Sequence, residues 1–201
     1  MIFADLHFHT EYSPDATNQP KTIVEKLNAH PTIKAIAITD HNTTEGYHHV
    51  KQLAKPYPDI LIIPAVEISA QEGEIILLGT EQLPPKPWTA QNLIDHAKTN
   101  NLITIAPHPY RGYGLADQTL KLDINAIETL NGITSPTLNK KAEQLAKTKH
   151  ATQVAGSDSH YPTDKWNVYT EIQANLNLEE ILKAIKNGHT KPNTTDTSIH
   201  F

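Results

Sequence analysis

Histidine, aspartate and glutamate recur in short motifs along this sequence, and these side chains bind metal ions without help from sulfur. The chain of 201 residues contains 12 histidines and no cysteine. Thiolate metal sites, disulfides and cysteine nucleophiles are therefore excluded, and any metal must be bound by imidazole and carboxylate groups. The candidate metal ligands are His7, His9, Asp15, His41, Glu67, His108, Asp158 and His160.

The spacing inside these motifs favours shared binding of an ion. His7 and His9 are two residues apart, and on a strand such side chains point to the same face. The same spacing recurs in Asp158 and His160, after Gly156, which allows a tight backbone path beneath them. His41 follows a strongly apolar run, where a buried polar group would cost free energy without a partner such as a metal.

Two further residues suggest how a metal cluster would act. The carboxylate of Glu67 can bridge two ions, because each of its oxygens can bind a different one. Arg111 is the only arginine of the chain and follows His108 by three residues. Its planar fork suits phosphate or carboxylate oxygens, although an ordinary surface salt bridge explains its position equally well. Asp15 is likewise open to a plain explanation, as a turn residue after Pro14.

Apolar runs of strand length alternate with helix-like segments, which predicts an α/β fold with a parallel sheet, either doubly wound or closed as a barrel. The expected strands are Ile2–Asp5, Lys34–Thr39, Ile60–Val66, Glu74–Leu78, Leu102–Ala106, Ala126–Leu130, Thr152–Ala155 and Tyr169–Ile172. The expected helices are Pro20–His30, Thr44–Lys55, Thr89–Asn100, Pro136–Lys149 and Leu178–Asn187. The candidate ligands lie at strand ends, and the carboxyl ends of parallel strands are where α/β folds form their sites.

At this point the sequence resembles the PHP (polymerase and histidinol phosphatase) family. The matching motifs are DLHFHT with SPDA, AITDHNT, IPAVEIS, APHPYR, IETLNG and AGSDSH, which span residues 5 to 160. The resemblance implies a distorted (β/α)7 barrel as a single domain, which we expect over residues 1–189. From its polar, irregular sequence we expect the tail over 190–201 to be loosely ordered or docked only at its end. The resemblance also implies phosphoester hydrolysis with two or three divalent metal ions, which would be manganese, zinc or iron.

The resemblance assigns ligands motif by motif. The first metal would take His7, His9, Glu67 and Asp158, the second Asp15, His41 and His160, and the third Glu67 and His108. Members of the family often place another histidine on the strand after the glutamate, and this chain has none there. Glu74 is the nearest candidate for that place, with an exposed carboxylate at a strand start as the alternative.

The remaining implied roles concern orientation and mechanism. Four residues are expected to orient the ligating imidazoles, namely Asp5, Asp40, Glu128 and Asn131. Two neighbouring cations would lower the pKa of a bridging water, so that a metal-bridging hydroxide attacks phosphorus while Arg111 binds the phosphate oxygens.

Charge and composition limit the partners. The net charge is −5 and the lysines are spread along the chain, which favours a small phosphorylated metabolite or a short nucleotide over a long nucleic acid. The start of the chain lacks the features of a signal peptide, and no apolar run approaches the ~20 residues of a membrane helix. We therefore expect a cytoplasmic protein. Two alternatives stay open, namely an amidohydrolase and a non-catalytic metal-binding or partner-docking module.

Overall fold

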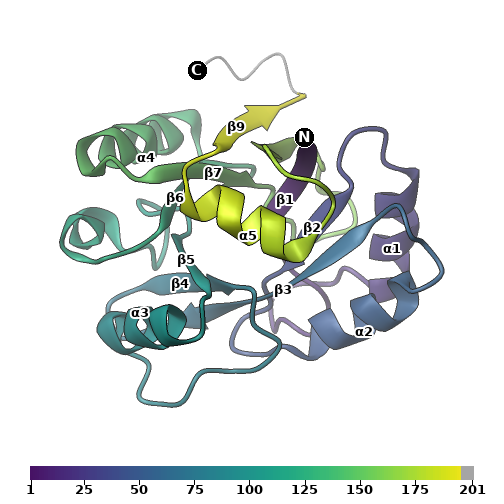
Figure 1. The fold of residues 1–201 in the computed structure, drawn as a ribbon, viewed down its shortest axis with the longest axis horizontal. Helices are drawn as coiled ribbons and strands as arrows, with labels where there is room; N and C mark the ends of the chain where they lie inside the picture. The colour runs from purple at the N-terminus through teal and green to yellow at the C-terminus, as the bar shows by residue number, and fades with distance from the viewer. Residues whose placement is uncertain (196–201) are drawn as a thin grey trace.

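Nine strands within residues 1–195, the part of the chain that the structure describes, form one sheet in the computed structural model (Figure 1). Their order is β7-β6-β5-β4-β3-β2-β1-β8-β9. The bounds are β1 Ile2–Phe8, β2 Ala35–Ile38, β3 Leu61–Ser69, β4 Glu74–Leu78, β5 Ile103–Ala106, β6 Ala126–Asn131, β7 Thr152–Gly156, β8 Val168–Ile172 and β9 Thr190–Thr194.

The sheet curves until β7 meets β1, so that β1 to β7 surround an interior. The backbone N–H of Asp158, just after β7, donates to the carbonyl of His7 in β1 at 2.8 Å, and Phe8 forms a bridge with Ser159. The predicted single-domain α/β fold with a barrel-shaped sheet is confirmed.

Helices pack against the barrel, and of the five α-helices in the described part of the chain four lie on its outer face and one at an end. They are α1 Pro20–Ala29, α2 Glu45–Ala54, α3 Ala90–Thr99, α4 Pro136–Lys149 and α5 Leu178–Lys186, with a 3₁₀ helix, η1, at Ala116–Lys121. Local sequence sets several starts: the side chains of Thr89, Ser135 and Asn177 each accept a backbone N–H from the first turn of α3, α4 and α5. The helix α1 pairs with α2 over the outer face of β1 to β3, and α3 packs against β4 and β5 (Figure 1).

The helix α5 has a different place, because it closes one end of the barrel. Its buried residues Ile181, Ala184 and Ile185 share a core with the inward side chains of the strands, such as Leu6 and Ile105. In Figure 1 this helix crosses in front of the strands. One end of the barrel is therefore filled by apolar side chains, which leaves the other end for polar groups.

Two strands contain an irregularity beside these polar groups. Between Asp5 and Phe8, β1 advances one residue more than its partner β2, and β6 does the same against β7 between Glu128 and Leu130. Such bulges change the direction in which the next side chains point. Here they occur where the candidate site residues begin.

Two expectations need correction. First, the sheet is not parallel throughout: β4 runs antiparallel to both β3 and β5, because only four residues, 70–73, connect β3 to β4. A parallel crossover needs a dozen or more residues. Second, residues 190–194 do not belong to a loosely ordered tail, since they form β9 and pair with β8. The rest of that predicted tail, 196–201, lies outside the described residues. Within the described part, no helix is long and apolar enough to cross a membrane.

Candidate metal centre

Four predicted ligands converge at the open end of the barrel interior. His7 Nε2 and His9 Nε2 lie 3.1 Å apart. Asp158 Oδ1 lies 3.2 Å and 3.3 Å from these two nitrogens, and Glu67 Oε2 lies at the same two distances. All four side chains are buried, so this deep group is shielded from solvent.

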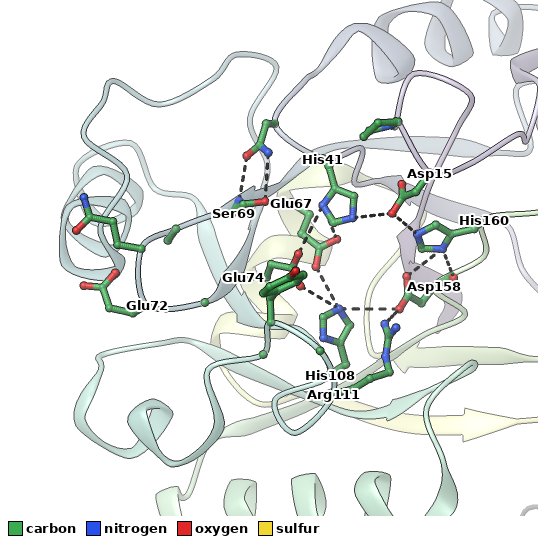
Figure 2. A pocket seen from close by; sticks show the side chains of 18 residues that line it. Asp15, His41, Glu67, Ser69, Glu72, Glu74, His108, Arg111, Asp158 and His160 are labelled. Atoms are coloured by element: carbon green, nitrogen blue, oxygen red, sulfur yellow. Dashed lines mark hydrogen bonds and ion pairs between the residues drawn. The ribbon is translucent and has the colours of Figure 1, made fainter.

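A second group lies nearer the surface. Asp15 Oδ2 is 3.6 Å from His41 Nε2 and 3.4 Å from His160 Nε2, as Figure 2 shows. The rings of His41 and His160 flank the ring of His9, and nitrogens of the three rings lie within 4.8 Å of one another. The structure thus places Asp15, His41 and His160 together, as the family resemblance implies.

The third group extends from Glu67 in the other direction. His108 Nε2 lies 3.3 Å from Glu67 Oε1 and 3.8 Å from Glu74 Oε2, while Glu74 Oε1 lies 3.9 Å from His41 Nδ1 (Figure 2). Glu74 is 7% exposed, so the alternative of an exposed carboxylate at the strand start is wrong. The hairpin causes this burial, since it pairs Glu74 with Ser69, two residues beyond Glu67.

The four residues expected to orient imidazoles divide into two kinds. Glu128 Oε1 lies 3.1 Å from His7 Nδ1, and the Asn131 amide donates to Glu128 and to Asp158. Glu128 therefore fixes an imidazole ring, and Asn131 fixes the carboxylates around it.

Within residues 1–195, Asp5 and Asp40 have no hydrogen bond to an imidazole ring, and their hydrogen bonds go to backbone N–H groups and to a hydroxyl instead. Asp5 accepts the backbone N–H groups of His7 and Ser157, and so ties β1 to the segment after β7. Asp40 accepts the N–H and the hydroxyl of Thr10 at 2.6 Å and 2.7 Å. Both carboxylates therefore shape the backbone beneath the site.

Ser13 is a site residue that the sequence analysis missed. Its hydroxyl lies 3.0 Å from His9 Nδ1 and accepts the backbone N–H of His41 at 2.9 Å. It links two of the imidazoles, which are 32 residues apart in the sequence (41 minus 9). Its place between His9 and Asp15 was the available indication.

Arg111 lies at the edge of the cluster with its side chain 32% exposed. Its Nε donates to the hydroxyl of Thr134 at 3.0 Å, and its Nη2 donates to Asp158 Oδ2. A guanidinium has five N–H donors, so three remain for other acceptors. The two contacts hold the fork in place beside the cavity.

The charges of the buried groups depend on one another. Burial lowers the pKa of His9, but contacts with Asp158 and Glu67 outweigh this effect and raise it to about 9. The pKa of His7 is raised well above its usual value in the same way, against burial, by Asp158, Glu128 and Glu67. Burial raises the pKa of Asp5 to about 7. The neighbouring carboxylates thus favour the charged form of both imidazoles, whereas burial favours the neutral form of Asp5.

The backbone around the cluster is closely packed at Gly156 and takes unusual conformations at His108 and Asp158. A Cβ on Gly156 would lie 2.3 Å from the Cβ of His7, so β7 can approach β1 this closely only with glycine there. His108 and Asp158 have φ of 26° and 55°, in the left-handed region that favours glycine. Strained backbone of this kind is typical of functional sites.

These side chains fit divalent metal ions. Imidazole nitrogens and carboxylate oxygens form four overlapping groups of three, each within the reach of one ion. His41 Nδ1, Glu67 Oε1 and His108 Nδ1 are buried without a hydrogen-bond partner, which costs free energy unless something binds there. Nitrogen and oxygen donors suit zinc, manganese and iron.

The cluster opens into a cavity of about 650 Å³. The loop around residues 70–73 forms one wall, and Arg111 to Gly114 form part of another. Figure 2 shows the labelled ligands pointing into this space from several different strands and loops. A bound molecule would therefore contact the metal ligands and Arg111 together.

The fold and the cluster define a class of protein, the α/β barrels with a candidate metal centre at the carboxyl ends of their strands. A family model described as the PHP domain matches residues 5–190, and the chain belongs to this family. The chain is also 33% identical to the uncharacterized protein MJ1587 of Methanocaldococcus jannaschii, in a match that covers 71% of this chain and 92% of that protein.

Solved structures share the fold. A protein from Bifidobacterium adolescentis, to which metal-dependent phosphoesterase activity has been ascribed, superposes with a TM-score of 0.66 at 15% identity, covering 94% of this chain and 96% of that one. Endonuclease Q, solved with a 27-mer duplex substrate bearing an abasic lesion, gives 0.66 at 18% identity and covers 94% and 58%. At these identities the likeness concerns the fold and carries no conclusion about substrate.

Proposed function

We propose that the protein is a metal-dependent phosphoester hydrolase that acts on a small phosphorylated metabolite or a short nucleotide. The observation that carries this proposal is the position of Arg111, whose fork is held beside Asp158 in the cavity that contains the cluster. A guanidinium group can donate two parallel hydrogen bonds to two oxygens of one phosphate. A phosphate bound at the cluster would therefore lie beside a donor, Arg111, that is already held in position.

Different residues would bind the metals and the substrate. The metals would be held by three groups of ligands, which contain His7 with His9, His41 with His160, and His108, and Glu67 would be shared among them. When bound, divalent metals supply an acidified water for attack on phosphorus and positive charge for its oxygens. Arg111 would bind and orient the phosphate, and the burial of the deep ligands keeps bulk water away.

A small substrate is supported by the charge of the cavity. Among the described residues that line it, Arg111 is the one lysine or arginine, whereas Glu72 is an exposed carboxylate outside the ligand set on the same lining. A protein that neutralises many phosphates needs clustered cations, and this cavity offers a single arginine. The positive charge of Arg111 and of the proposed metals is sufficient for a substrate with one or two phosphate groups.

The test is a hydrolysis screen of chelator-treated protein, reconstituted with Mn²⁺, Zn²⁺ or Fe²⁺, against phosphorylated metabolites, amide substrates, cyclic dinucleotides and oligonucleotides from dinucleotides to 20-mers. We expect metal-dependent release of phosphate or nucleotide, and loss of it in Asp158→Asn. An exposed-site variant, His49→Gln, serves as the control, since His49 lies outside the cluster.

Three outcomes would count against the proposal. Stoichiometric metal binding without hydrolysis of any phosphoester would point to a binding module. Cleavage of amide substrates alone would point to an amidohydrolase. Strong preference for 20-mers over dinucleotides, weakening steeply with salt, would make the protein a nuclease for long strands.

A further inference from the structure

A second cavity, of about 620 Å³, lies on the outside of the barrel between α4 and β9 (Figure 1). Residues of α4 form one wall, residues of β9 form the other, and β6 and β7 contribute the floor. Its described lining residues include none of the candidate metal ligands. The volume is close to that of the cavity at the metal centre and lies in the range of small-molecule sites.

Two lysines on opposite walls give this second cavity a positive charge. Lys140 belongs to α4 and Lys191 to β9, and both line the cavity. Within the described part of the chain, neither lysine forms an ion pair. The carboxylate among the lining residues, Glu143, is already paired with Lys147. The charge of the cavity therefore favours an anion, and two lysines can neutralise two negative charges.

The floor adds a polar group to these charges. Thr129 lines the cavity and is 5% exposed, and its hydroxyl makes no hydrogen bond to any residue from 1 to 195. A buried hydroxyl without a partner costs free energy, so a ligand that bonds to it would recover that cost. Apolar surface surrounds this group, from Leu130 on the floor and from Pro136 and Pro192 on the walls. Apolar walls with a few polar groups are typical of sites for small organic molecules.

We propose that the cavity between α4 and β9 is a second ligand site, which binds a small organic phosphate. A phosphate monoester carries nearly two negative charges at pH 7, which Lys140 and Lys191 would neutralise. One phosphate oxygen would accept the hydroxyl of Thr129, and the organic part would lie against Leu130 and the two prolines. The inference does not depend on the proposed function, because it uses none of the metal ligands and not Arg111.

The experiment records the backbone amide NMR signals of the ¹⁵N-labelled full chain during titration with phenylphosphonate. This probe is an organic dianion with an apolar ring, and a phosphoester hydrolase cannot cleave its carbon–phosphorus bond. We expect the signals of Thr129, Leu130 and Lys191 to shift together and to saturate with one Kd of about 1 mM or tighter. Signals around Arg111 report separately on binding at the first cavity.

The variants remove the positive charge or the hydroxyl. Lys140→Gln combined with Lys191→Gln should weaken binding at the second cavity about 10-fold or more, and leave binding at the first cavity unchanged. Thr129→Val, which keeps the shape of the side chain, should weaken it about 3-fold. The matched control combines Lys141→Gln with Lys183→Gln, which removes the same charge from α4 and α5 outside the cavity lining. The control should bind like the native protein.

Three results would overturn the inference. The first is the absence of saturating shifts at Thr129 and Lys191. The second is equal weakening in the control pair, which would mean a general attraction between charges and no defined site. The third is tighter binding in Ile199→Ser with Phe201→Ser, which would mean that the end of the chain competes for the cavity. Binding at the second cavity without hydrolysis of any phosphoester would refute the proposed hydrolase alone.

Discussion

The affinity for metal should depend steeply on pH, because protons and metals compete for the same imidazoles. An imidazole binds a metal only in its neutral form. The pKa of His9 is raised to about 9: burial lowers it, but Asp158 and Glu67 raise it by more. With a pKa of about 9 the ring is mostly protonated at pH 7, so the apparent affinity there should be weaker than above pH 9 by roughly 100-fold, on the order of 3 kcal/mol.

The direction of the pH effect and the pH range in which it occurs follow from the same pKa. Raising the pH increases the neutral fraction of His9, so the logarithm of the metal affinity should rise by about one per pH unit between pH 6.5 and 8.5. The rise should be steeper if His7 also loses its proton on binding. The raised pKa also stabilises the metal-free fold, fully below pH 6.5 and progressively less as pH rises through 9.

The assay is competition of Mn²⁺ against a fluorescent chelator under anaerobic conditions, with proton release measured by calorimetry in buffers of different ionisation enthalpy. The control variant His49→Gln should show the same slope. An affinity that stays constant between pH 6.5 and 8.5, with no protons released, would refute the reasoning and mean that the imidazoles are neutral before the metal arrives.

Three other predictions concern single residues. Glu128→Gln should weaken metal binding about 10- to 100-fold, because the carboxylate fixes the ring of His7; unchanged Mn²⁺ affinity in the same titration would contradict this. Arg111→Ala should lower kcat/KM roughly 10²-fold, ~2.7 kcal/mol, and Arg111→Lys should recover only part of it. Near-native kinetics of Arg111→Ala would mean that Arg111 contacts Asp158 but does not bind the substrate phosphate. Gly156→Ala should destabilise the fold by about 1–3 kcal/mol, because the new Cβ would lie 2.3 Å from the Cβ of His7; an unshifted thermal midpoint would show that β7 can move away.

Most strands and helices could be predicted from the sequence. The prediction failed for the direction of β4 and the existence of β9, which depend on pairing with a neighbouring strand. The run Glu74–Leu78 is apolar and reads the same for a parallel and an antiparallel strand. Only the short link 70–73 indicated a hairpin, since it leaves no room for a crossover. The strand β9 contains Pro192 and polar residues, and it exists because β8 offers it an edge, which local pattern does not reveal.

For the site, residue types and strand ends were sufficient to place the eight predicted ligands together, because the carboxyl ends of barrel strands meet. Which side chain faces which was not predictable. The bulge after Asp5 and the one after Glu128 change the direction of the following side chains, and they depend on the register of neighbouring strands. The burial of Glu74 and the link made by Ser13 likewise arise from contacts between distant segments.

The meeting of β1 and β7 also has a consequence for how this chain comes to hold its metals during synthesis. His7 and Asp158 lie 3.2 Å apart although nearly the whole domain separates them along the chain. A ribosome releases His7 early and Asp158 late, so the deep ligand group cannot exist on a nascent chain until seven strands have emerged. Contacts this distant in sequence make folding slow, since the loop must close before the contact stabilises anything. A bound ion would then join β1 to the segment after β7. The closed barrel would open more slowly for as long as the metal stays bound.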